Sequence, residues 1–171
     1  MIAMMAARNS VDAAVKEQGL FGRPELFAFV NADAHYSMDR AANILGLGSA
    51  HLRKIPVDEH GRMRIEVLEA QLAEVVAAGG IPFFVAATAG TTVRGSYDRI
   101  EPLLALRQRY RFWLHVDGAM CGTAVARTIS SWLIDSHILQ INSQTIACAL
   151  FGAIIWNLLT NSIKFTPGGG Q

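Results

Sequence analysis

The first 117 residues alternate between short apolar runs and segments in which apolar residues recur with a helical spacing. A short apolar run bounded by polar or glycine-rich residues is typical of a strand buried on both faces. A helical spacing is typical of an amphipathic helix that packs on a sheet. Strands alternating with helices predict an α/β fold with a mostly parallel sheet. The expected strands are 26–31, 52–57, 81–87 and 112–117, and the expected helices are 34–45, 65–78 and one from Ile100 onward.

Two further segments have simple interpretations. Residues 1–9 are apolar or small, and no basic region precedes them, so they predict the start of a buried helix rather than a secretory signal. The polar segment Asp58-Glu59-His60-Gly61 predicts a turn in solvent, in which Gly61 is free to adopt positive φ.

The ends of two expected strands carry residues suited to chemistry. Thr88-Ala89-Gly90-Thr91-Thr92 follows one apolar run, and Asp117-Gly118-Ala119 closes the next. Ligands of parallel sheets bind beyond the carboxyl ends of the strands, so both segments are expected to line one crevice. A strand-end aspartate also often caps the next turn, and the local sequence leaves both roles open for Asp117. His35 falls at a strand-to-helix junction, where the local sequence alone favours a surface or capping histidine.

Composition narrows the class of protein. With 171 residues, 51% of them hydrophobic, the chain is long enough for one domain with a sizeable core. A formal net charge of +1 gives no electrostatic footprint for nucleic acid. The two cysteines, Cys121 and Cys148, provide neither a disulfide framework nor a metal site. A reduced, cytoplasmic setting fits this composition.

The character of the chain changes after about Ala124. Between Thr128 and Ile163 the only formal charge is Asp135, and residues 146–159 are almost wholly apolar. This run is shorter than the roughly 20 residues that a membrane helix needs, so it predicts a buried helix rather than a membrane segment. We therefore divide the chain into residues 1–124 and a divergent apolar segment, 125–171.

The first part of the chain carries five motifs in order: His35-Tyr36-Ser37, Leu45-Gly46-Leu47-Gly48, Val57-Asp58-Glu59-His60-Gly61-Arg62-Met63, Ala87-Thr88-Ala89-Gly90-Thr91-Thr92-Val93-Arg94-Gly95 and Trp113-Leu114-His115-Val116-Asp117-Gly118-Ala119. These motifs resemble those of pyridoxal-phosphate-dependent group II amino-acid decarboxylases, which include glutamate, cysteine-sulfinate and aromatic amino-acid decarboxylases. The resemblance runs from about Arg8 to about Ala124. It implies the central part of the large domain of a fold-type I enzyme, a homodimer, and a small acidic or aromatic amino acid as substrate.

The resemblance also implies roles for individual residues toward pyridoxal phosphate. Asp117 matches the acid that keeps the cofactor's ring nitrogen protonated, and His35 matches the imidazole stacked on the ring. Thr92 lies where the family places a hydroxyl against the polar edge of the cofactor. Ala119 lies where a small side chain packs under the ring, and His115 lies in the strand that leads to the acid.

Two parts of the family pattern have no counterpart in this sequence. The glycine-rich and hydroxyl-rich phosphate loop would precede Met1, so the chain is expected to begin inside a domain. The family's Schiff-base lysine lies in a segment of the form Asp-Ser, three residues, Asn or Asp, one residue, His-Lys. Asp135-Ser136 matches its start, but Asn142-Ser143 stands where His-Lys is expected, and Lys164 is the only lysine after Asp117.

The missing lysine predicts that this chain alone is inactive. Two explanations remain open: a truncated or out-of-frame product of a decarboxylase gene, and a degenerate paralogue retained for binding. The alternative function is a non-catalytic fragment that at most associates with a full-length homologue.

Overall fold

The computed structural model describes residues 1–91 and 93–118, which belong to the first of two units of the chain, Met1–Met120. The expectations for Thr92, Ala119, Lys164 and the segment 125–171 lie outside the described residues.

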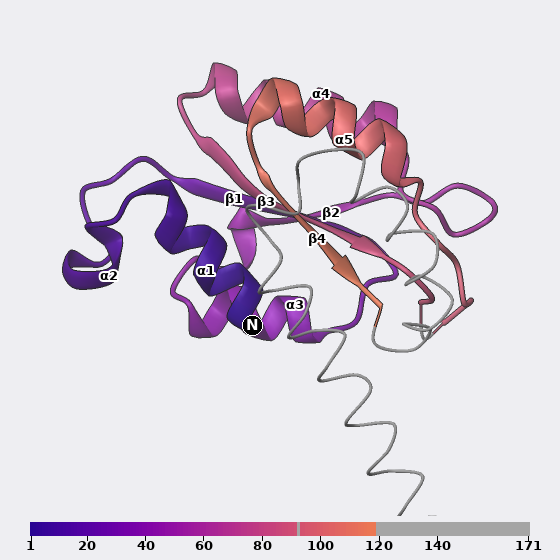
Figure 1. The fold of residues 1–171 in the computed structure, drawn as a ribbon, viewed down its shortest axis with the longest axis horizontal. Coiled ribbons are helices and arrows are strands. Elements are labelled where there is room, and N and C mark those ends of the chain that lie inside the picture. The colour runs from indigo at the N-terminus through magenta and orange to yellow at the C-terminus, as the bar shows by residue number, and fades with distance from the viewer. Residues whose placement is uncertain (92, 119–171) are drawn as a thin grey trace, which may run out of the picture. The chain divides into compact units, whose positions relative to one another are not determined.

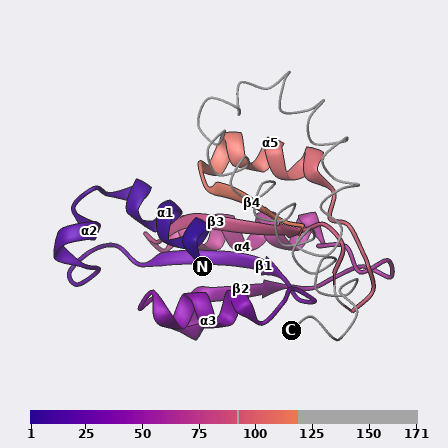
Figure 2. The same cartoon turned by 60° about the horizontal axis from the view of Figure 1, so that its bottom comes forward.

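The described residues form a four-stranded sheet in which all neighbouring strands are parallel. The strands are β1 (Leu26–Asn31), β2 (Leu52–Ile55), β3 (Ile81–Thr88) and β4 (Trp113–Asp117), and their order is β2-β1-β3-β4. Figure 2 shows the four strands side by side in this order. The expected α/β fold with a mostly parallel sheet is confirmed.

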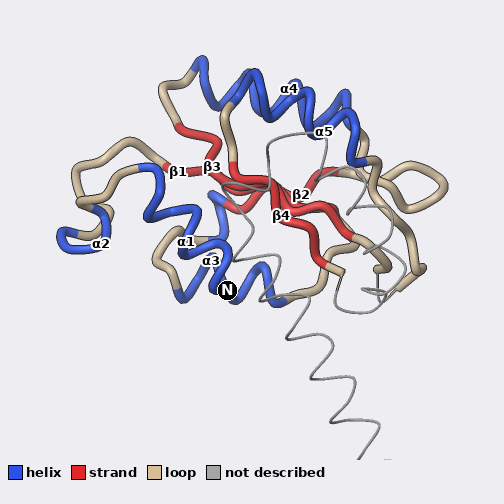
Figure 3. Tube along the Cα trace, viewed as in Figure 1, coloured by secondary structure: helices blue, strands red, loops and turns tan. Residues whose placement is uncertain are grey.

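Helices cover both faces of the sheet, as Figures 1 and 3 show. α1 (Ile2–Val11) and α3 (Ser37–Ile44) pack on one face, and α4 (Ile65–Ala77) and α5 (Ile100–Tyr110) pack on the other. A short helix, α2 (Val15–Gln18), and a 3-10 turn, η1 (Ser49–His51), complete the described elements. Met4 and Ala7 are buried, which confirms the buried helix expected at the amino terminus.

Alternation along the strands separates the core into two clusters. Because successive side chains of a strand point to opposite faces, Ala28 and Val30 belong to the cluster that includes residues of α1 and α3, whereas Phe29 between them belongs to the cluster that includes residues of α4 and α5. The register of β3 shifts by one residue opposite Phe27 and Ala28. As a result Phe83 and Phe84 both belong to the cluster under α1 and α3.

The largest differences from the expected bounds are at the end of β2 and the start of α3. β2 stops at Ile55, two residues early, because Pro56 has no N–H to donate to a neighbouring strand. Helix α3 begins at Ser37 rather than at residue 34. The Asn31 side-chain oxygen accepts a hydrogen bond from the Asp33 N–H at 2.8 Å, which forms a turn before the helix starts.

Candidate functional site

The carboxyl ends of three strands meet at one edge of the sheet, which we call the carboxyl edge. β1 ends at Asn31, β3 at Thr88 and β4 at Asp117. Thr88 and Asp117 are partners in the parallel register, and the Ala89 N–H donates a hydrogen bond to the Asp117 carbonyl oxygen at 2.8 Å. The segments that follow β3 and β4 therefore start side by side, as the expected crevice requires.

Asp117 is the last residue of β4 and is partly buried. Strand alternation places it on the same face as Trp113 and His115. Trp113 packs on the cluster under α1 and α3, so Asp117 lies on the face that these helices cover.

His35 lies in the junction between β1 and α3 and is exposed. Its Nδ1 accepts a hydrogen bond from the Ser37 backbone N–H at 3.3 Å, so the neutral ring carries its proton on Nε2. The ring centroids of His35 and Tyr36 are 4.2 Å apart, and the Arg40 guanidinium lies 4.4 Å from the Tyr36 centroid. His35 thus carries an Nε2–H in the turn that leads into α3, a helix on the face of the sheet that carries Asp117.

His115 is held in the sheet two residues before Asp117. Its ring stacks on Phe84, with centroids 5.7 Å apart and planes inclined by 25°. Burial lowers the pKa of His115 below its ordinary value, and the nearby negative charge of Asp117 opposes this shift without cancelling it. The histidine is therefore neutral at pH 7.

This lowered pKa predicts that the protein loses stability in mild acid. Below an ordinary pKa of about 6.5 the unfolded chain binds a proton at His115 that the folded protein binds less readily. The free energy of unfolding should therefore fall as the pH drops below about 6.5. Urea unfolding at several pH values would measure this. His115→Gln should flatten the slope and His60→Gln, in an exposed turn, should not; the same slope in all three proteins would contradict the assignment.

A buried polar network, which the sequence did not predict, lies behind the carboxyl edge. Its centre is Asp98, which is 6% exposed, and Asn31, which is fully buried. Asp98 Oδ1 accepts from Asn31 Nδ2 at 2.9 Å and from the Met63 N–H at 2.6 Å. Asp98 Oδ2 accepts from the Thr88 N–H at 2.7 Å and from the Thr88 hydroxyl at 2.9 Å. The one signal in the sequence was an asparagine closing an otherwise apolar strand.

The network continues into the loop after β3. The Ser96 hydroxyl donates to the Gly61 carbonyl oxygen at 2.9 Å, and the hydroxyls of Thr91 and Ser96 are 2.9 Å apart. Asn31 Nδ2 also donates to the Gly61 carbonyl at 3.2 Å. Hydrogen bonds thus connect the end of β1, the turn after β2 and the loop after β3.

Gly61 adopts the positive φ that its turn predicts, at +74°. The expectation that the whole turn lies in solvent is only partly correct. Glu59 and His60 are exposed, but Gly61 is buried because Ser96 packs directly against it.

Nearer the surface, an ion pair links the turn after β1 to the loop after β3. Arg94 Nε lies 3.3 Å from Asp33 Oδ2, with Arg94 about half exposed and Asp33 about one-fifth exposed. The backbone N–H of Arg94 also donates to the Thr91 hydroxyl at 3.2 Å. Thr91 and Arg94, which are described on either side of Thr92, are therefore bonded to each other. Arg94 also ties this loop to the turn after β1.

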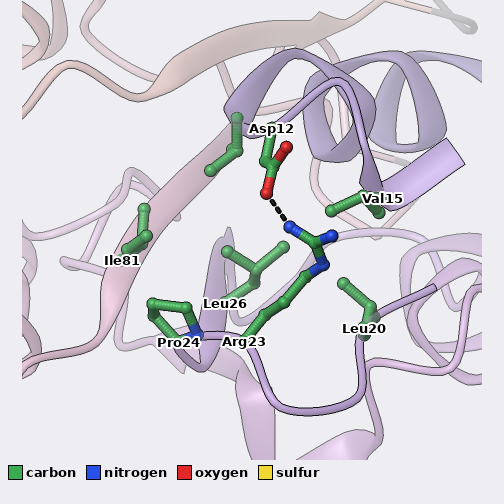
Figure 4. A pocket seen from close by; sticks show the side chains of 8 residues that line it. Asp12, Val15, Leu20, Arg23, Pro24, Leu26 and Ile81 are labelled. Atoms are coloured by element: carbon green, nitrogen blue, oxygen red, sulfur yellow. Dashed lines mark ion pairs between the residues drawn. The ribbon is translucent and has the colours of Figure 1, made fainter. Parts of the chain in front are cut away.

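A shallow hollow lies at the opposite edge of the sheet, where the strands begin (Figure 4). The first residues of β1 and β3, Leu26 and Ile81, line it together with an ion pair between Arg23 and Asp12. It is mainly apolar and shares no residue with the carboxyl edge.

Residues 1–91 and 93–118 offer neither a metal cluster nor a membrane-spanning helix. These residues contain no group of three or more His, Cys, Asp or Glu side chains arranged to hold a metal ion. Nor does any helix in this part of the chain have the length and apolar character needed to cross a membrane.

Comparison with known proteins identifies relatives of this chain. Human acidic amino acid decarboxylase GADL1 is 40% identical over 125 residues, which cover 73% of this chain and 24% of that protein. Human cysteine sulfinic acid decarboxylase is 38% identical over 135 residues, 79% of this chain and 27% of that protein. A crystal structure of mouse CSAD in apo form matches with a TM-score of 0.67 and 41% identity, covering 68% of this chain and 25% of that one.

The chain thus spans about a quarter of the length of these relatives. The family model described as the pyridoxal-dependent decarboxylase conserved domain matches residues 1–154. This match extends beyond the stretch from Arg8 to Ala124 that carries the motifs, and it confirms the resemblance that they indicated. The cofactor of the family is pyridoxal phosphate. The chain belongs to the family of pyridoxal-dependent decarboxylases.

Proposed function

We propose that this chain carries the ring-binding part of a pyridoxal-phosphate site for decarboxylation of a small amino acid. The observation that carries the proposal is the placement of Asp117 and His35. Both lie at the carboxyl edge, and both are on the side of the sheet that α1 and α3 cover. An acid at the end of β4 and an imidazole in the turn after β1, at the same edge of the sheet with the end of β3 between them, fit an aromatic, nitrogen-containing cofactor.

The assigned role of Asp117 is to hold a proton on the ring nitrogen of the cofactor. When bound, pyridoxal phosphate supplies an electron sink for the carbanion left by loss of carbon dioxide. Asp117 suits this role because β3 fixes its backbone through the Ala89 hydrogen bond at 2.8 Å. His115, two residues earlier in the same strand, is neutral and adds no positive charge of its own beside Asp117.

The assigned role of His35 is to cover the ring face and to hold a proton near the reacting centre. Its Nδ1 is engaged by the Ser37 N–H, which fixes the ring orientation and leaves Nε2 as the atom that exchanges a proton. By resemblance, Thr92 would contact the polar edge of the cofactor and Ala119 would pack under its ring. Thr92 lies between the described residues Thr91 and Val93 in the loop after β3. Ala119 directly follows Gly118, the last described residue after β4.

The substrate that we propose is an acidic amino acid. Two relatives at 38% and 40% identity carry names that specify an acidic amino acid or cysteine sulfinic acid as substrate. We also propose a cytoplasmic homodimer, as the family resemblance implies. Because the sequence offers no lysine in the family's context, we further propose that the chain by itself is impaired in catalysis. A non-catalytic fragment that associates with a full-length homologue is the second candidate, favoured by the same missing lysine.

Equilibrium dialysis with pyridoxal phosphate would test the proposed ring site. Asp117→Ala removes a hydrogen bond to a charged group and should weaken binding about 10-fold to 100-fold. His35→Ala removes stacking and should weaken it by a smaller factor, about 2-fold to 10-fold. His51→Ala, at the opposite edge of the sheet where β2 begins, is the matched control and should bind like the parent chain. Equal affinity in all four proteins would remove the basis of the proposal.

A further inference from the structure

We propose that Asp98 is a positioning residue that sets the geometry of the carboxyl edge, on which both Asp117 and His35 depend. The consequence for the cofactor rests on the proposed function. The consequence for the backbone does not, and it can be measured without any ligand.

Asp98 is the point at which three separate segments of the chain converge. Its carboxylate accepts four hydrogen bonds, at 2.6 to 2.9 Å. The donors come from the end of β1 (Asn31), from the segment after β2 (Met63) and from the end of β3 (Thr88). The backbone N–H of Asp98 returns a bond to the Thr88 carbonyl oxygen at 2.9 Å.

The chemistry of this position requires a carboxylate rather than an amide. An ionised carboxylate only accepts hydrogen bonds, and its two oxygens offer about four lone-pair sites. All four bonds to Asp98 use these sites, two at each oxygen. An asparagine would turn one oxygen into an NH₂ group that faces two N–H donors, or an N–H and a hydroxyl. In a site only 6% exposed, water cannot relieve this conflict.

Short paths lead from Asp98 to both candidate cofactor residues. Thr88, held through its N–H and its hydroxyl, is the register partner of Asp117. Asn31, held through Nδ2, accepts from the Asp33 N–H at 2.8 Å and so shapes the turn that carries His35 two residues later. Asp98 therefore fixes the positions at which the chain leaves β1 and β3, and it acts on both candidate residues through Thr88 and Asn31.

Amide hydrogen exchange measured by mass spectrometry tests this inference on the full chain. Asp98→Asn should speed exchange at residues 28–35 and 86–98, where the strands end, by about tenfold or more. Exchange within α4 and α5 should stay as in the parent chain. Asp12→Asn is the matched control, because Asp12 also accepts a backbone N–H, from Ala14 at 2.8 Å, but lies at the opposite edge.

Cofactor binding provides the second readout. By equilibrium dialysis, Asp98→Asn should weaken affinity for pyridoxal phosphate about tenfold, and Asp12→Asn should leave it unchanged. If the parent chain binds no pyridoxal phosphate, the proposed function fails, and hydrogen exchange alone decides the role of Asp98.

The positioning role is overturned if exchange at residues 28–35 and 86–98 is unchanged in Asp98→Asn. It is also overturned if exchange rises equally throughout the chain, α4 included, because that result indicates general stabilisation only. Should Asp98→Asn fail to fold, Thr88→Val decides by the same criteria. It keeps the backbone N–H bond to Asp98 at 2.7 Å and removes the hydroxyl bond at 2.9 Å, so the same local pattern is expected with a smaller amplitude.

Discussion

The 171-residue chain is expected to release carbon dioxide from amino acids no faster than free pyridoxal phosphate does. The family holds its cofactor through a lysine that follows the ring-nitrogen aspartate in a His-Lys context. Here Asn142-Ser143 stands in that place, and Lys164 lies in the unrelated context Asn161-Ser162-Ile163-Lys164-Phe165. Without a positioned amine, contacts from Asp117 and His35 alone should give weak and reversible binding. Catalysis should then lack the covalent exchange with substrate that the family resemblance implies.

Carbon dioxide release would be assayed with glutamate, cysteine sulfinate, aspartate and aromatic amino acids. Saturable release that Asp117→Ala abolishes would contradict the expectation and would show that another amine replaces the lysine. Borohydride reduction followed by mass spectrometry would then identify that amine, and Lys164→Ala would be the first variant to test. Release that does not depend on Asp117 would indicate the background reaction of the cofactor.

Gly61→Ala should lower the free energy of unfolding by about 2–5 kcal/mol, from two additive causes. A side chain at φ +74° costs about 1–2 kcal/mol because the Cβ approaches the following carbonyl oxygen. A Cβ at this position would also lie 3.0 Å from Ser96 Oγ and 3.1 Å from Ser96 Cβ. Ser96 cannot move away freely, because its hydroxyl donates to the Gly61 carbonyl oxygen. This overpacking adds about 1–3 kcal/mol.

Gly79→Ala separates the two causes. Gly79 has a similar φ, +82°, but a Cβ there would meet no atom within 4 Å. Gly79→Ala should therefore lower the free energy of unfolding only by the backbone strain, about 1–2 kcal/mol. Urea unfolding of the parent chain and both variants measures the difference. Equal costs at the two positions would show that the contact between Gly61 and Ser96 does not constrain the loop after β3.

Local patterning gave reliable information about the sheet and its helices. The apolar run 26–31 coincides with β1, and the run 81–87 lies within β3, which extends one residue further. The helix expected at 65–78 ends one residue earlier, at Ala77. These predictions succeed because the spacing of apolar residues reports directly on which side chains are buried, and each element carries several such residues. The positive φ predicted for Gly61 from its turn sequence is also confirmed.

Ordered motifs identified the family, and the same motifs gave the candidate roles of His35, Thr92, Asp117 and Ala119. The parallel sheet then accounts for two of them. Because β3 and β4 are neighbours in register and His35 precedes a helix on the relevant face, His35 and Asp117 share one edge of the sheet. The roles themselves remain predictions that cofactor binding will test.

The sequence by itself determined the family, the succession of strands and helices along the chain, and the conformation of the turn at Gly61. These features depend on residues that lie close together along the chain. Only the tertiary structure decided which polar groups support the carboxyl edge. Asn31 and Asp98 are 67 positions apart, and Met63 and Asp98 are 35 apart, so no local pattern relates them. Their hydrogen bonds exist only once the parallel strands have paired in register and brought the ends of β1 and β3 together.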